Sequence, residues 1–191
     1  LNDENITEGN VTITGLKAST SYQFTIYNND HARGTRTATT RIQIPEANLV
    51  VRINAGATLT QEMLDSWAEE ESVTVRFEEG AEYTLVGVDP ATGDPAGLTI
   101  PSNLSITFFG AEGSEKAILK IAREIVMGGT HAYVRFINLT INDGGAQYLF
   151  NQGVDATATE ISFKDCDINN FTRSVIRFKD EKSISSDLLS F

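Results

Sequence analysis

The chain has 191 residues, of which 40% are hydrophobic and 21% are charged, as expected for one or two globular domains. A net charge of −11 argues against nucleic acid as a partner, because an acidic surface repels the phosphate backbone. No apolar run is long enough to cross a membrane as a helix, and a single cysteine excludes a disulfide within the chain.

The first 44 residues are expected to form a few antiparallel strands. Residues 10–13 predict a short strand, and residues 21–27 alternate so that Tyr22, Phe24 and Ile26 share one face. Residues 28–34 predict a hairpin turn and residues 36–42 a returning strand. We therefore divide the chain into two domains, residues 1–44 and residues 45–191.

Residues 61–71 have the one helical pattern in the sequence. Thr60 is the predicted N-cap, and Leu59 and Leu64 occupy the positions of a hydrophobic staple. Leu64 and Trp67 lie on one apolar stripe. We expect this helix to cover the open end of the core that follows it in the chain.

Residues 134–141 and 161–168 repeat one strand pattern, 27 residues apart. Each copy alternates apolar and polar residues, breaks step at Asn138 or Asp165, and then resumes. Further copies, spaced by 28 or 31 residues, begin at Val75, Ile106 and Leu189. The same strand returning at a nearly fixed period predicts a solenoid.

A second set of strands is predicted 11, 12 and 13 residues after the apolar Phe residues of the first set, beginning at Leu119, Tyr148 and Ile176. Two or three short strands per coil predict an all-β fold, a right-handed parallel β-helix of about four to five coils. The last strand pattern opens a new coil, so we expect these coils to be the N-terminal part of a longer, truncated β-helix.

Two family resemblances add to this interpretation. The spacing of Gly15, Leu16 and Tyr22 resembles the last three strands of a fibronectin type III domain. That resemblance implies a tyrosine corner, in which the hydroxyl group of Tyr22 bonds to nearby backbone.

Residues 46–191 resemble the pectate-lyase-like right-handed β-helices in a "G-x-Y" strand followed by an "I-x-x-N-L-x-I-x-G" strand. The matching residues are Gly80, Tyr83, Ile100, Asn103, Leu104, Ile106 and Gly110. The resemblance implies a bacterial protein of polysaccharide utilisation, carrying a domain of unknown function and located outside the cell, in the periplasm or on the outer surface. In that family, calcium bound by acidic residues assists a lyase reaction on uronates.

The candidate metal ligands are Asp143, Asp165 and Asp167, because outward residues of adjacent coils stack about 4.8 Å apart and calcium prefers several carboxylates. Arg177 and Lys179 are the candidate basic residues for polysaccharide. The alternative for Asp165 is a turn ladder with Asn138 that satisfies backbone groups.

Phe109 and Phe171 are the candidate aromatic residues for sugar stacking, Phe109 because its position in the alternation is outward. Cys166 is expected to be a core residue and not a nucleophile. His31 and His131 are expected to lie in turns and to form no metal cluster.

Three functions remain open. The pattern favours a secreted or cell-surface protein that binds polysaccharide without catalytic machinery, since at most two acidic residues come together. A calcium-assisted lyase or a glycoside hydrolase is the second, and a structural spacer or adhesin stalk is the third.

Overall fold

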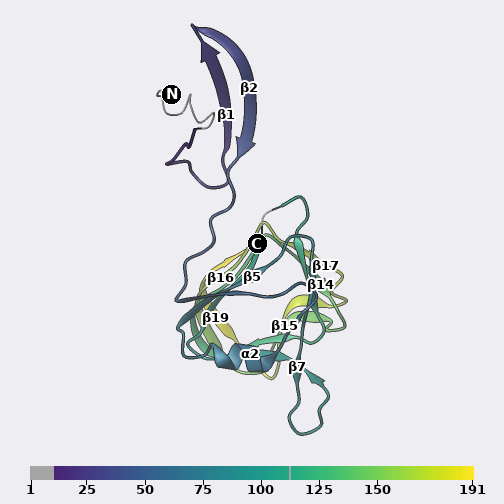
Figure 1. Ribbon diagram of the computed structural model, residues 1–191. Helices are drawn as coiled ribbons and strands as arrows, with labels where there is room; N and C mark the ends of the chain where they lie inside the picture. The colour runs from purple at the N-terminus through teal and green to yellow at the C-terminus, as the bar shows by residue number, and fades with distance from the viewer. Residues whose placement is uncertain (1–10, 112) are drawn as a thin grey trace. The chain divides into compact units, whose positions relative to one another are not determined.

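In a computed structural model, which describes residues 11–111 and 113–191, the chain divides into two compact units. They are Leu1–Ile44 and Pro45–Phe191 (Figure 1). Nearly all regular structure in both units is β-strand.

The first unit contains an antiparallel hairpin of strands β1 (Ser21–Asn28) and β2 (His31–Thr39). Its turn is narrower than predicted, because Asn29 and Asp30 alone have left-handed φ angles of 49° and 62°. Two consecutive left-handed residues match the twist of a hairpin, so His31 already belongs to a strand. The strand predicted at 10–13 is wrong for residues 11–13, which are irregular; Asn10 lies outside the described residues.

The hairpin has one half-buried face near its base. Tyr22 and Phe24 are half-buried, and the Tyr22 hydroxyl accepts a hydrogen bond from the Lys17 backbone N–H at 2.8 Å. Ile26 is 63% exposed although it follows them in the alternation. The register shifts between Ile26 and Tyr27, which marks where the regular pairing of the hairpin is interrupted.

The second unit is a parallel β-solenoid of about five coils, built from three parallel sheets. Sheet 1 contains, in spatial order, β3 (Leu49–Arg52), β5 (Ser72–Phe77), β10 (Ser105–Gly110), β13 (Gly129–Ile137), β16 (Ala156–Lys164) and β19 (Ile184–Ser190). Sheet 2 contains β4 (Thr58–Leu59), β6 (Glu82–Leu85), β11 (Ala117–Ile121), β14 (Leu139–Asp143) and β17 (Asp167–Asn169). Sheet 3 contains β9 (Leu98–Ile100), β12 (Ile125–Met127), β15 (Tyr148–Gln152) and β18 (Ser174–Phe178). The parallel β-helix predicted from the repeat is confirmed.

The predicted second set of strands mixes two sheets. Leu119 lies in β11 of sheet 2, whereas Tyr148 and Ile176 lie in β15 and β18 of sheet 3. The reason is loop length: β10 and β11 are separated by residues 111–116, but Asn138 alone separates β13 from β14. Counting from the preceding Phe residue therefore reached different sheets in different coils.

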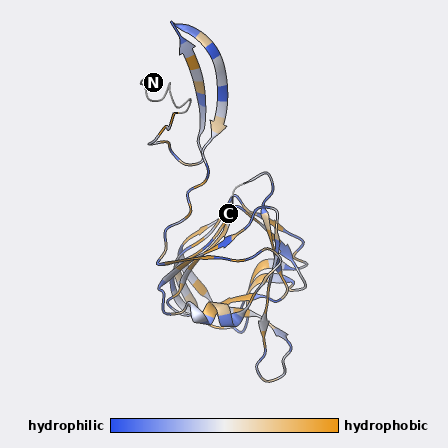
Figure 2. Ribbon diagram, viewed as in Figure 1, coloured by the Kyte–Doolittle hydropathy of each residue, from blue (hydrophilic) through white to orange (hydrophobic). Residues whose placement is uncertain are grey.

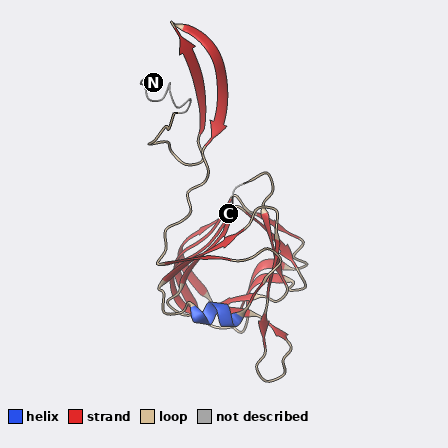
Figure 3. Cartoon of the chain, viewed as in Figure 1, coloured by secondary structure: helices blue, strands red, loops and turns tan. Residues whose placement is uncertain are grey.

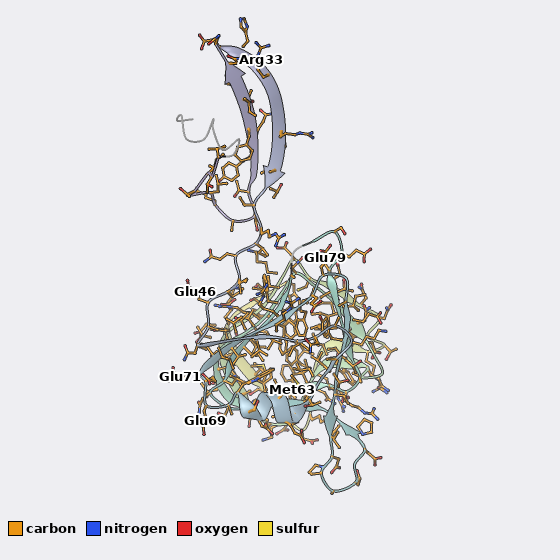
Figure 4. All side chains as sticks on the ribbon, in the orientation of Figure 1. Arg33, Glu46, Met63, Glu69, Glu71 and Glu79 are labelled. Carbon is orange, nitrogen blue, oxygen red and sulfur yellow. The ribbon has the colours of Figure 1, made fainter. Side chains whose placement is uncertain are left out.

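A column of five stacked phenylalanine rings follows the inner face of sheet 1; four of the rings lie in the core, and the last, Phe191, is exposed. Successive ring centroids are 6.4, 4.8, 5.0 and 5.1 Å apart, and the rings lie within 18° of parallel. The column consists of Phe77, Phe108, Phe136, Phe163 and Phe191. Apolar residues recur along the strands (Figure 2), and their side chains fill the space between the sheets (Figure 4). The inward positions of the repeat thus build one continuous core.

Two of the turns between sheets 1 and 2, β13 to β14 and β16 to β17, contain one left-handed residue each. Asn138 and Asp165 have φ angles of 54° and 53°, a conformation that Asn and Asp tolerate better than most residues. The Asn138 side-chain amide donates to the carbonyls of Gly110 at 3.2 Å and Ala111 at 3.1 Å, one coil away. Asn138 thus satisfies backbone groups of the neighbouring coil, as the ladder interpretation predicts for this residue.

Helix α2 (Gln61–Ser66) lies along one side of the first coil, next to the edge of β9, and is shorter than predicted (Figure 3). Thr60 is its N-cap residue without a side-chain capping bond, while Leu64 and Trp67 are buried in the core. The Gln61 side chain pairs with the edge of β9: its Nε2 donates to the Thr99 carbonyl at 2.9 Å and its Oε1 accepts from the Thr99 N–H at 2.7 Å. An amide side chain thereby replaces a strand at this edge.

A short antiparallel hairpin of β7 (Gly87–Val88) and β8 (Pro95–Ala96) extends from the solenoid between sheets 2 and 3 (Figure 1). It contains the Pro- and Gly-bearing insertion that lengthens the first coil.

Candidate functional site

Two arginines and one tyrosine meet on sheet 3, and we call Tyr148, Arg173 and Arg177 the arginine face. Tyr148 begins β15, Arg173 directly precedes β18, and Arg177 lies within β18. Arg173 Nη1 donates to the Tyr148 hydroxyl at 3.0 Å. The Cζ atoms of Arg173 and Arg177 lie 5.9 and 5.4 Å from the centre of the Tyr148 ring. The phenol ring, 7% exposed, thus fixes the positions of two exposed guanidinium groups by cation–π contacts.

Both guanidinium groups are free to bind an anion. Within residues 11–111 and 113–191, the ion pairs involve other cations and leave Arg173 and Arg177 without a carboxylate partner. Guanidinium groups bind carboxylate, sulfate or phosphate oxygens through paired N–H donors. In a chain of net charge −11, two adjacent unpaired arginines are a local exception to the acidic surface.

A buried amide lies next to the arginine face, on the neighbouring strand β15. Asn151 lies in register with Arg177, and its Nδ2 donates to Glu124 Oε1 at 3.2 Å, one coil back. Asn151 is 7% exposed, and its Oδ1 finds no hydrogen-bond donor in the described part of the chain. Asn151 therefore links Glu124 of the preceding coil to the strand beside Arg177.

The sequence predicted part of this face. Arg177 belongs to it, and Lys179 follows β18 in the same coil, with its backbone N–H donating to the Gln152 carbonyl at 2.9 Å. Tyr148 and Arg173 were missed. The available signal was the coil repeat, because Tyr148 is in register with Ser174, the neighbour of Arg173.

The expectation that Phe109 is an outward ring for sugar contact is wrong, since it is 2% exposed. Its neighbour Thr107 is fully buried as well, so the outer face of sheet 1 is covered here. The segment before β3 crosses this face at β5, where Thr74 Oγ1 donates to the Pro45 carbonyl at 3.0 Å. Phe171 is half-buried and packs against the core, which limits its use as a sugar platform.

The three predicted metal ligands have other partners or positions. Asp143 Oδ1 accepts backbone N–H groups from the turn at Gly145 (2.7 Å) and Ala146 (2.6 Å). Asp167 pairs with Lys116 at 2.9 Å, and Asp165 occupies the left-handed turn. Among the described residues, no group of three or more His, Cys, Asp or Glu side chains is placed to hold a metal ion.

Glu160 lines a hollow of about 490 Å³ near the ends of β16 and β19. The hydrogen bond from Arg135, at 2.5 Å, holds the pKa of the Glu160 carboxyl below its ordinary value, against the opposing effect of burial. A general acid needs a carboxyl group that retains its proton near neutral pH. Glu160 is therefore suited to an ion pair and not to proton donation.

Cys166 packs against the core, as expected. Burial raises the pKa of its thiol to about 11, so the thiol stays protonated at neutral pH and is a poor nucleophile. The prediction that His131 lies in a turn is wrong, because His131 belongs to β13 and is 2% exposed. His31, likewise, begins β2.

The chain is a parallel β-solenoid that carries two exposed arginines around Tyr148 on its third sheet. Comparison with protein families, with curated proteins and with solved structures finds no match for the chain. No helix in the described residues is both long and apolar enough to span a membrane.

Proposed function

We propose that this protein binds an acidic polysaccharide, such as a pectin-like uronan, through the arginine face. The observation that carries the proposal is the pair of unpaired guanidinium groups fixed around Tyr148. Uronate units repeat a carboxylate along the chain, and each arginine can donate two parallel hydrogen bonds to one carboxylate. Arg173 and Arg177 are both exposed, so an extended polymer can reach both guanidinium groups.

We also place the solenoid among pectate-lyase-like β-helices, preceded by the C-terminal strands of a fibronectin type III domain. The β-solenoid itself and the bond between Lys17 and the Tyr22 hydroxyl support this placement. Both features fit a secreted or cell-surface protein that captures polysaccharide. The proposal assigns binding without catalysis, because the candidate metal ligands Asp143 and Asp167 are engaged in a turn and an ion pair, and Glu160 is paired with Arg135.

The test compares binding of polygalacturonate with binding of a neutral galactan. The wild-type chain should retain polygalacturonate, and retention should weaken with added salt because exposed charges are screened. The double variant Arg173→Gln/Arg177→Gln should lose at least about a hundredfold in affinity, since it removes at least two charge-assisted hydrogen bonds of about 1.5–3 kcal/mol each.

Lys164→Gln is the matched control, because Lys164 is an exposed cation on another sheet. Its affinity should stay within about twofold of wild type. Equal loss in the control would assign binding to net charge alone and refute the arginine face. Incubation of the wild-type chain with polygalacturonate and calcium tests the lyase alternative. A rise in ultraviolet absorbance that a chelator abolishes would show that the protein is a lyase and would refute the proposal of binding without catalysis.

A further inference from the structure

His131 occupies an inward position of the coil repeat. It lies 27 residues after Leu104 and 27 residues before Ala158, and its register partner in β16 is Ala158. The side chain is 2% exposed. A titratable ring thus stands in a column whose neighbours in the adjacent coils are apolar.

The ring connects two successive coils through one nitrogen and leaves the other without a partner. His131 Nδ1 lies 2.7 Å from the Leu104 carbonyl oxygen. A carbonyl only accepts, so Nδ1 carries the proton and Nε2 of the neutral ring carries a lone pair. Nε2 is buried and has no hydrogen-bond partner among the described residues.

Among the described residues, no charged side chain is placed to pair with a protonated ring. The flanking strand β10 carries no charged residue. Glu160 on β16 is paired with Arg135 of β13, and Lys164, at the end of β16, is exposed. Burial lowers the pKa of His131, and this outweighs the opposing effect of the Leu104 carbonyl; no charged group of the described chain contributes.

We propose that His131 is an acid-sensitive clasp between the coils of β10 and β13. Uptake of a solvent proton at Nε2 creates a buried cation and a new N–H donor that has no acceptor, which weakens the packing of these coils. The solenoid is then most stable when His131 is neutral. This device is independent of the polysaccharide proposal.

The sign of the effect follows from linkage. The unfolded chain takes up the proton near the ordinary His pKa of 6.5, whereas the folded chain does so only at lower pH. The contribution of neutral His131 to the free energy of unfolding is therefore fully present above pH 6.5, and it falls as the pH drops toward the pKa of His131 in the folded chain. In that window the unfolding equilibrium constant should rise by up to about tenfold per pH unit.

The test uses the intact chain, which has two histidines. Its imidazole NMR signals are followed against pH, and urea unfolding is measured between pH 7.5 and 5. This window avoids Asp155 and Glu160, whose pKa values are lowered from 3.8 and 4.5. His131→Gln, which can still donate to the Leu104 carbonyl, and His131→Leu should abolish the pH dependence. His31→Gln, at an exposed position, should retain the wild-type dependence.

Two results would overturn this proposal. One is a His131 NMR signal that titrates at or above pH 6.5. The other is a pH dependence of the unfolding free energy that persists unchanged in the folded His131 variants. If neither variant folds, the NMR titration of the wild-type chain decides alone.

Discussion

Replacement of Phe136 by Ala should be among the most damaging single changes in the solenoid. Phe136 is fully buried and lies between the stacked rings of Phe108 at 4.8 Å and Phe163 at 5.0 Å, with Phe150 edge-on at 6.2 Å. A buried Phe→Ala change costs about 3–5 kcal/mol, and each aromatic pair adds about 0.5–1.5 kcal/mol beyond its buried area. Because Phe136 makes three aromatic pairs, we expect Phe136→Ala to lower the free energy of unfolding by about 5 kcal/mol, the upper end of the range for a buried Phe→Ala change.

Urea unfolding followed by the fluorescence of Trp67 measures this change. Trp67 is the one tryptophan of the sequence and is 7% exposed in the core. Circular dichroism should be recorded in parallel, because coils of a solenoid can unfold separately and two-state behaviour must be checked.

Phe191→Ala provides the comparison within the same column. Phe191 stacks on Phe163 at 5.1 Å but is 71% exposed, so its loss should cost about 1 kcal/mol. If Phe136→Ala costs no more than Phe191→Ala, the ring column does not hold the coils together and the argument fails.

Two further predictions concern single side chains. Gln61→Met removes both hydrogen bonds to Thr99, so it should lower the free energy of unfolding by about 1–3 kcal/mol and speed hydrogen exchange at the Thr99 amide. The control Gln23→Met, at an exposed hairpin position, should change neither quantity. Unchanged exchange at Thr99 in Gln61→Met would contradict the edge-pairing role of Gln61. Cys166, with its pKa raised to about 11, should react slowly with iodoacetamide at pH 8 in the folded chain and much faster in urea, and equal rates would show an accessible thiolate.

The coil repeat and the turn chemistry could be predicted from the sequence because both depend on short-range rules. Inward positions alternate with a period of two along each strand, which identified the Phe column and the inward Cys166. A left-handed residue between sheets 1 and 2 selects Asn or Asp, which explains the break in pattern at Asn138 and Asp165.

Long-range packing decided what the sequence could not. Alternation placed Phe109 outward, but this outward position is covered in the folded chain, and Phe109 is 2% exposed. Likewise, Tyr148 and Arg173 are 25 residues apart and meet because a coil returns the chain to the same sheet. Strand periodicity is a local property of the backbone, whereas coverage of a face and the meeting of side chains depend on loop lengths and on segments distant in sequence.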